Sequence, residues 1–212
     1  MKFQSKGMLS PFTVMTSVLT GVGFPLLGSF VALDIGVVDT LYINGLILVA
    51  IGGFLAHWVL AHCIHDLYHI NIENRVTFSK KTLRILLIIS LVVLSAIGLY
   101  LAFQRGWPVI VFAIIGLLAT LYAEGLLHFP SQMAIGAMFL VIGSFYVQVG
   151  TLNLDYIVWL KVICIALFSY ISQYGWLKIY RLDDYEYSDK LKNKNILLTK
   201  SALIFLILYI LL

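Results

Sequence analysis

Seven long runs of apolar residues, separated by short polar stretches, make up most of this chain. A membrane-spanning helix needs about 20 mostly apolar residues. The runs that approach or exceed this length are residues 11–33, 41–66, 83–104, 107–123, 132–150, 156–179 and 198–212. The run from 86 to 103 is apolar on all sides, as lipid-embedded helices are. The pattern predicts an all-α bundle of about seven transmembrane helices, with residues 1–212 forming a single domain.

The composition supports an integral membrane protein. Hydrophobic residues make up 61% of the chain and charged residues 11%, and the mean hydropathy is +1.00. Soluble domains are about 45–50% apolar and about 25% charged, so an ordinary soluble domain is excluded. The two cysteines, Cys63 and Cys164, lie inside apolar runs, which argues against a disulfide framework or a thiolate zinc site.

Small residues inside the apolar runs mark expected contacts between helices. Glycine lets two helix backbones approach closely in a membrane. We therefore expect close packing at Gly52, Gly53, Gly136 and Gly143.

Basic residues lie overwhelmingly on one side of the predicted bundle. With seven alternating spans, Arg105 and Lys161 fall on one side and twelve basic residues on the other. The twelve are Lys2, Lys6, Arg75, Lys80, Lys81, Arg84, Lys178, Arg181, Lys190, Lys192, Lys194 and Lys200. The positive-inside rule places this side in the cytoplasm, with the N-terminus inside and the C-terminus outside. Topology thus accounts for the net charge of +4 without a nucleic-acid partner.

Acidic residues form two clusters on the same predicted cytoplasmic side. The first is HDLYHINIE, residues 65–73, and the second lies within YRLDDYEYSDKLKNKN, residues 180–195. Each cluster ends an even-numbered span, and a basic stretch follows it. This recurrence is a weak internal repeat.

The first cluster suits a divalent cation. If the helix continues through it, His65, His69 and Glu73 share one face, and Asp66 lies beside His65. In the second cluster Asp183, Glu186 and Asp189 are spaced by three. Magnesium prefers oxygen ligands, and it often binds through a few carboxylates together with substrate phosphates.

Three basic side chains beside the clusters suit a phosphorylated substrate. Arg75, Arg181 and Lys194 are candidates to hold phosphate oxygens. A diphosphate held by metal and cations above an apolar bundle indicates a prenyl diphosphate.

These residues resemble the UbiA superfamily of membrane prenyltransferases. HDLYHINIE is similar to the family's NDxxDxxxD motif, with Asp66 kept and with His65, His69 and Glu73 at the other three positions. The second cluster is similar to the DxxxD-type motif after the sixth helix, and FYVQVG (residues 145–150) is close to a stretch in members that prenylate dihydroxynaphthoate. The likeness covers nearly the whole chain. The family usually has nine helices, and this chain has room for seven.

The resemblance implies Mg²⁺-dependent transfer of a prenyl group to an aromatic or other lipid-soluble acceptor, as in quinone biosynthesis. The expected partners are the prenyl diphosphate, the acceptor and the bilayer. We assign Asp66, His69 and Asp189 to catalysis and Arg75, Arg181 and Lys194 to the diphosphate. The candidate metal ligands are His65, Asp66, His69, Glu73, Asp184, Glu186 and Asp189.

Two other interpretations remain open. The histidines in the first motif and the reduced helix number favour a degenerate relative that binds a prenyl lipid or quinone without catalysis. His62, His65 and His69 are spaced as a single histidine face, which would suit Zn, Fe or Cu. His57, one turn deeper, is expected to be a packed polar residue.

Overall fold

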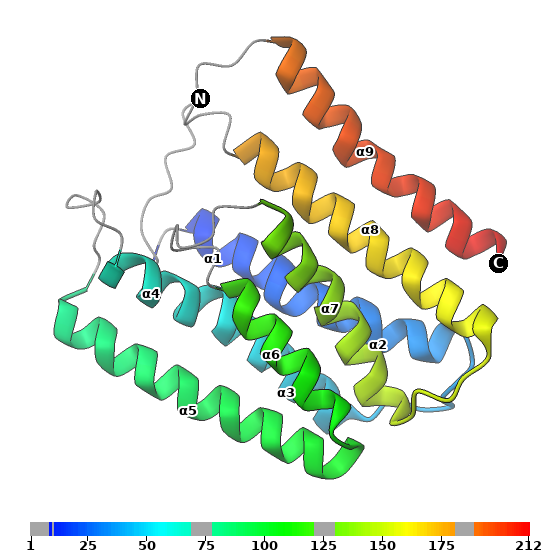
Figure 1. The fold of residues 1–212 in the computed structure, drawn as a ribbon, viewed down its shortest axis with the longest axis horizontal. Helices are drawn as coiled ribbons and strands as arrows, with labels where there is room; N and C mark the ends of the chain where they lie inside the picture. The colour runs from blue at the N-terminus through cyan, green and yellow to red at the C-terminus, as the bar shows by residue number, and fades with distance from the viewer. Residues whose placement is uncertain (1–8, 10, 69–77, 121–129, 181–188) are drawn as a thin grey trace.

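The computed structural model describes residues 9, 11–68, 78–120, 130–180 and 189–212 (Figure 1). Within these residues all regular secondary structure is helical, which confirms the predicted all-α bundle. The elements in order are α1 (Pro11–Val18), η1 (Leu19–Gly23), α2 (Phe24–Asp34), α3 (Ile43–Phe54), η2 (Leu55–Leu60), α4 (Ala61–Tyr68), α5 (Lys80–Arg105), α6 (Pro108–Thr120), α7 (Pro130–Val149), α8 (Tyr156–Tyr180) and α9 (Asp189–Leu211).

Six helices are long and apolar enough to cross a membrane. They are Val14–Asp34, Ile43–Tyr68, Lys80–Arg105, Ser131–Val149, Tyr156–Ile179 and Asp189–Leu211. The fourth predicted span is present as α6, whose 13 described residues extend about 20 Å at about 1.5 Å per residue. This described part is shorter than the roughly 30 Å hydrocarbon core. The six long apolar helices identify the protein as a multi-pass membrane protein.

The last helix begins earlier than the sequence indicated. We expected it to cover residues 198–212, but α9 starts at Asp189. An acidic residue in the first turn interacts favourably with the positive end of the helix dipole. Lysines at the end of a spanning helix can extend toward the membrane surface. The polar stretch therefore continues the helix, and Asp189 begins α9 instead of ending the sixth span.

The first two spans each contain a π-helical turn. The η1 segment joins α1 to α2, and η2 joins α3 to α4, without an interruption of the helix. A π-turn is rare and occurs mostly as a single turn inside an α-helix, frequently near functional sites.

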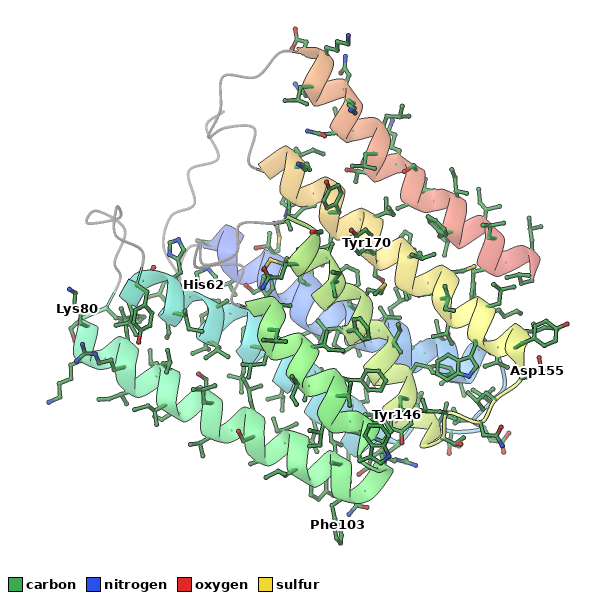
Figure 2. All side chains as sticks on the ribbon, viewed as in Figure 1. His62, Lys80, Phe103, Tyr146, Asp155 and Tyr170 are labelled. Carbon is green, nitrogen blue, oxygen red and sulfur yellow. The ribbon has the colours of Figure 1, made fainter. Side chains whose placement is uncertain are left out.

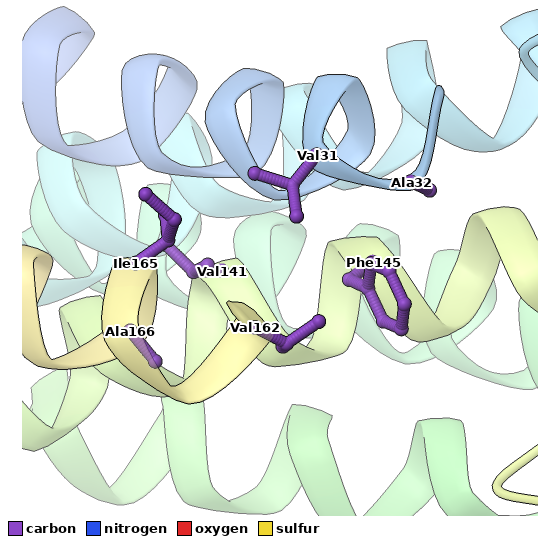
Figure 3. Packing of buried hydrophobic residues seen from close by; sticks show 7 residues of the cluster. All are labelled: Val31, Ala32, Val141, Phe145, Val162, Ile165 and Ala166. Carbon is purple, nitrogen blue, oxygen red and sulfur yellow. The ribbon is translucent and has the colours of Figure 1, made fainter. Parts of the chain in front are cut away.

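The main core lies where α2, α7 and α8 meet (Figure 3). Phe145 of α7 is completely buried there, together with valine, isoleucine and alanine side chains from all three helices. The cluster consists of Val31, Ala32, Val141, Phe145, Val162, Ile165 and Ala166. Small and β-branched side chains fill this region, so the three helices pack closely.

Close contacts between helices occur at several glycines. A Cβ on Gly21 would lie 2.6 Å from the carbonyl oxygen of Gly53, and a Cβ on Gly53 would collide with the carbonyl oxygen of Gly21. Close packing is also confirmed at Gly136 and Gly143, where an added Cβ would lie 2.5 Å from Ala119 Cβ and 3.1 Å from Phe112 Cβ.

The expectation for Gly52 was wrong. An added Cβ there would meet Leu94 Cδ2 at an ordinary 3.8 Å, because this position faces a cavity instead of a neighbouring backbone. Of the two adjacent glycines, Gly53 alone joins the first two spans.

Replacement of Gly53 by alanine should destabilise the protein by about 1–3 kcal/mol or more, because the new methyl group overlaps backbone atoms that cannot move aside. The matched change Gly52→Ala should be neutral or stabilising by up to about 1 kcal/mol, since alanine favours the helix. Thermal unfolding in detergent, followed by tryptophan fluorescence, measures both. Equal effects of the two variants would contradict the assignment of the contact.

Candidate functional site

The described part of the first polar motif lies at the end of α4. The helix carries His62, His65 and Asp66 in its last two turns and is described as far as Tyr68. Nδ1 of His62 donates a hydrogen bond to the carbonyl oxygen of Trp58 at 2.8 Å. This bond uses one ring nitrogen of His62 within its own helix.

Asp66 is the one acid of this motif among the described residues, and its side chain is buried. Its side chain is only 5% exposed, and its Oδ1 lies 3.0 Å from Nδ1 of His65. Its Oδ2 is buried and has no hydrogen-bond partner within the described part of the chain. Burial of a carboxylate oxygen is costly unless a donor or a cation satisfies it. Asp66 is therefore the strongest candidate for a ligand at this end of the bundle.

Most of the remaining predicted site residues lie outside the described residues. These are His69, Glu73 and Arg75 of the first motif and Arg181, Asp184 and Glu186 of the second. Their assignments stay predictions.

Asp189 and Lys194 lie on the first turns of α9, and both are exposed. The helix packs along α8, whereas α4 packs against α5. Figure 1 shows the start of α9 well separated from the end of α4. Asp66 and Asp189 are therefore not brought together by the described helices themselves.

Among the described residues, no group of three or more His, Cys, Asp or Glu side chains is arranged to hold a metal ion. His62 and His65 thus do not form a complete metal site with Asp66. Further ligands for a metal at the first motif would come from residues beyond the described end of α4, from water or from substrate phosphates.

His57 lies deeper in the same span, within η2. Its Nδ1 is 3.1 Å from Oγ of Ser17, a completely buried residue of α1. Nearby in η1, Thr20 Oγ1 donates to Oε1 of Gln173 on α8 at 3.4 Å. These bonds join three spans, as expected for packed polar residues inside a membrane bundle.

An apolar cavity of about 390 Å³ lies between α3, η2, α5, α6 and α7. Among the described residues that line it, Ser95 and Ser144 are the only ones with polar side chains, and none is charged. Its size falls within the range of roughly 300–1,000 Å³ that is typical of small-molecule sites. The nearest lining residue on the second span, Ala56, is ten residues from Asp66, or about 15 Å along the helix.

The FYVQVG stretch, which supported the family resemblance, has a structural role. Gln148 Oε1 accepts a hydrogen bond from the backbone N–H of Tyr42 at 2.7 Å, and its Nε2 donates to Ser29 Oγ at 3.3 Å. The hydroxyl of Tyr146 donates to the carbonyl oxygen of Arg105 at 2.5 Å. These bonds join α7 to the middle of α2, the start of α3 and the end of α5. They lie at the opposite end of the bundle from Asp66, so neither side chain belongs to the candidate metal site.

Sequence reasoning missed the Gln148 network because a single amide in an apolar run has no pattern of its own. Its buried position, with only 3% of the residue exposed, is visible only in the folded bundle.

Comparison with known proteins gives no relative: no family model, no curated protein and no solved structure matches the chain.

Replacement of Gln148 by leucine should destabilise the fold by about 1–3 kcal/mol, because the partly buried N–H of Tyr42 would lose its acceptor. The matched change Gln104→Leu, at an exposed position of α5, should alter stability by less than about 0.5 kcal/mol. Thermal unfolding of the two variants in the same detergent checks this. Similar melting temperatures for both variants would mean that the Gln148 bonds contribute little.

Proposed function

We propose that this protein is a Mg²⁺-dependent intramembrane prenyltransferase of the UbiA type. It would move a prenyl group from a prenyl diphosphate to an aromatic or other lipid-soluble acceptor. The observation that carries the proposal is Asp66, a buried acid at a helix end, with one oxygen held by His65 and the other without a described partner.

The chemistry of Asp66 fits magnesium. A buried carboxylate oxygen is the type of ligand that this hard cation prefers. Magnesium bound there would neutralise negative charge on the diphosphate leaving group. His65 contacts Asp66 through Nδ1, so its role is to orient the carboxylate, as partners of metal ligands commonly do.

The other residues complete the proposal from the sequence. Glu73, Asp184, Glu186 and Asp189 would add carboxylate ligands, and His69 would act as a further ligand or as a base toward the acceptor. The diphosphate would be bound by Arg75, Arg181 and Lys194. Lys194 is exposed on the first turns of α9, at the end of the chain's long polar stretch, where it is accessible to a charged substrate.

A second function is favoured by the apolar cavity. A cavity without charged lining suits the chain of an isoprenoid or a quinone whether or not any transfer takes place. The protein would then be a non-catalytic lipid binder, and its binding would not depend on a divalent cation.

The proposal places both motifs at the cytoplasmic face. Twelve basic residues on one side of the predicted bundle against two on the other support this orientation, with the N-terminus inside and the C-terminus outside.

Membranes containing the full chain should form a prenylated product from a radiolabelled prenyl diphosphate and dihydroxynaphthoate in Mg²⁺ but not in EDTA. Asp66→Asn should lower the rate by about tenfold to a hundredfold or more, because a neutral amide binds the cation poorly. Asp155→Asn is the matched control, since this exposed acid lies at the other end of the bundle. Its rate should equal that of the wild type.

A wild-type rate of product formation for Asp66→Asn would show that Asp66 is not part of the catalytic site. No product with any acceptor, combined with isoprenoid binding that persists in EDTA, would establish the lipid binder instead.

Orientation is testable with two exposed positions at opposite ends of the bundle. A cysteine at Asp39, between α2 and α3, should react with a membrane-impermeant maleimide on intact cells. A cysteine at Lys81, at the start of α5, should react only after the membrane is permeabilised. The native Cys63 and Cys164 are buried and give a low background. The opposite labelling pattern would show that the protein has the inverted topology.

A further inference from the structure

The cavity opens sideways, toward the surface that faces lipid. Two of its lining residues are strongly exposed: Leu99 of α5 is 65% exposed and Ile114 of α6 is 51% exposed. The turn at Arg105–Trp107 joins α5 to α6, and the two helices contact each other beside these residues, since a Cβ on Gly98 would lie 3.8 Å from Ala113 Cβ. The opening therefore lies between α5 and α6 beyond this contact, toward Gly116, where an added Cβ would meet no atom within 4 Å. An apolar chain from the bilayer can enter there without crossing a polar surface.

Exposed aromatic residues border this turn. Phe103 is 88% exposed and Trp107 is 72% exposed. Figure 2 shows Phe103 pointing away from the bundle at this end. Aromatic side chains at a helix end are enriched at the level of lipid headgroups. The turn thus lies where a lipid whose chain fills the cavity would have its headgroup.

Arg105 is held in place at this turn. Its guanidinium lies over the ring of Tyr42, with 4.3 Å between Cζ and the ring centroid. A Cβ added to Gly150 would lie 3.3 Å from Nη1 of Arg105, so the backbone of the loop after α7 passes close beside the cation. Stacking on an aromatic face orients the planar guanidinium and leaves its N–H groups available at the edge.

No described acid forms an ion pair with Arg105. Across the described residues the one ion pair is His65 with Asp66, so none of the acids at this end, Asp34, Asp39 and Asp155, pairs with Arg105. The nearest other cation at this end, Lys161, lies over the ring of Tyr209 on α9.

Tyr42 connects the cation to the cavity. Its ring packs against the buried cluster of Leu101, Val109, Tyr146 and Val147. Three of these side chains, Leu101, Val109 and Val147, also line the cavity. The guanidinium therefore lies beyond the end of the cavity, separated from it by the Tyr42 ring and by the side chains of this cluster.

We propose that the α5–α6 turn and the cavity form a binding site for one anionic phospholipid. Arg105 binds the phosphate, and one acyl chain passes between α5 and α6 into the cavity. This site lies at the opposite end of the bundle from Asp66 and does not depend on prenyl transfer.

The charge of the site selects this ligand class. One guanidinium matches the single negative charge of a headgroup such as phosphatidylglycerol. A prenyl diphosphate carries more negative charge and needs metal ions or several cations. The described residues around Arg105 supply neither.

The test measures lipid binding to the purified full-length protein by native mass spectrometry. Phosphatidylglycerol and phosphatidylcholine with the same acyl chains are titrated separately. Wild-type protein should retain one phosphatidylglycerol with an affinity at least about fivefold above that for phosphatidylcholine. Arg105→Gln should abolish this preference, and Lys161→Gln, which removes a cation at the same end, should leave it unchanged.

A second variant tests the chain of the lipid. Gly116 lines the cavity, and a Cβ there would meet no atom within 4 Å, so the side chain of Gly116→Leu begins in open space. This variant should lower the affinity for both phospholipids by a similar factor. Gly23→Leu, at another glycine with open space around it, is the control and should not change binding.

Three results would overturn the proposal. An equal preference for phosphatidylglycerol over phosphatidylcholine in Arg105→Gln and Lys161→Gln would show that Arg105 does not bind the headgroup. Unchanged lipid binding in Gly116→Leu would show that the acyl chain does not occupy the cavity. Displacement of phosphatidylglycerol by glycerol phosphate or by farnesyl diphosphate at equal concentration would assign Arg105 to a soluble phosphate or to a prenyl substrate.

Discussion

A bilayer supplies no water to hydrogen-bond an exposed amide, and this constraint determines the structure of the chain. Each spanning segment must satisfy its own backbone, so the apolar runs become helices. Because lipid tails are as apolar as leucine, the hydrophobic effect does little to draw these helices together. Packing of small residues and a few buried hydrogen bonds must do so. The contact between Gly21 and Gly53 and the Gln148 bonds are the clearest examples.

The sequence predicted the helices well because their signal is long and simple. A run of about 20 apolar residues has few alternatives in a membrane, and all seven runs are helical in the described residues. The start of α9 was placed too late because hydropathy alone treats its lysines as a loop. The sequence predicted a close helix contact at both Gly52 and Gly53, although the structure has one at Gly53 alone. Which of two adjacent glycines faces a neighbouring helix depends on the rotation of its own helix, which the sequence does not show. The π-turns, which change that rotation, have no apolar pattern of their own.

The candidate chemistry divides between the two ends of the bundle. Asp66 and His65 lie at the end that carries both polar motifs, while Arg105 lies at the other, with the apolar cavity nearer to Arg105. The sequence selects Asp66 through its motif, and the structure adds its burial, which no sequence pattern shows. Arg105 had been counted only as one of two basic residues on the sparsely charged side, because its position over Tyr42 joins residues 63 positions apart. Such a contact has no local signature.

The π-turn in η2 makes the orientation of the first motif sensitive to chain length. A π-turn accommodates one residue more than an α-helical turn, so loss of a single residue within Leu55–Leu60 would let the helix become regular. One residue corresponds to about 100° of rotation. After such a deletion, either the half of the span before η2 or the half after it must turn. Gly53 could then keep its contact with Gly21 only if His65 and Asp66 moved to a different side of the helix. Natural variants of this chain should therefore tolerate substitutions in η2 far better than insertions or deletions.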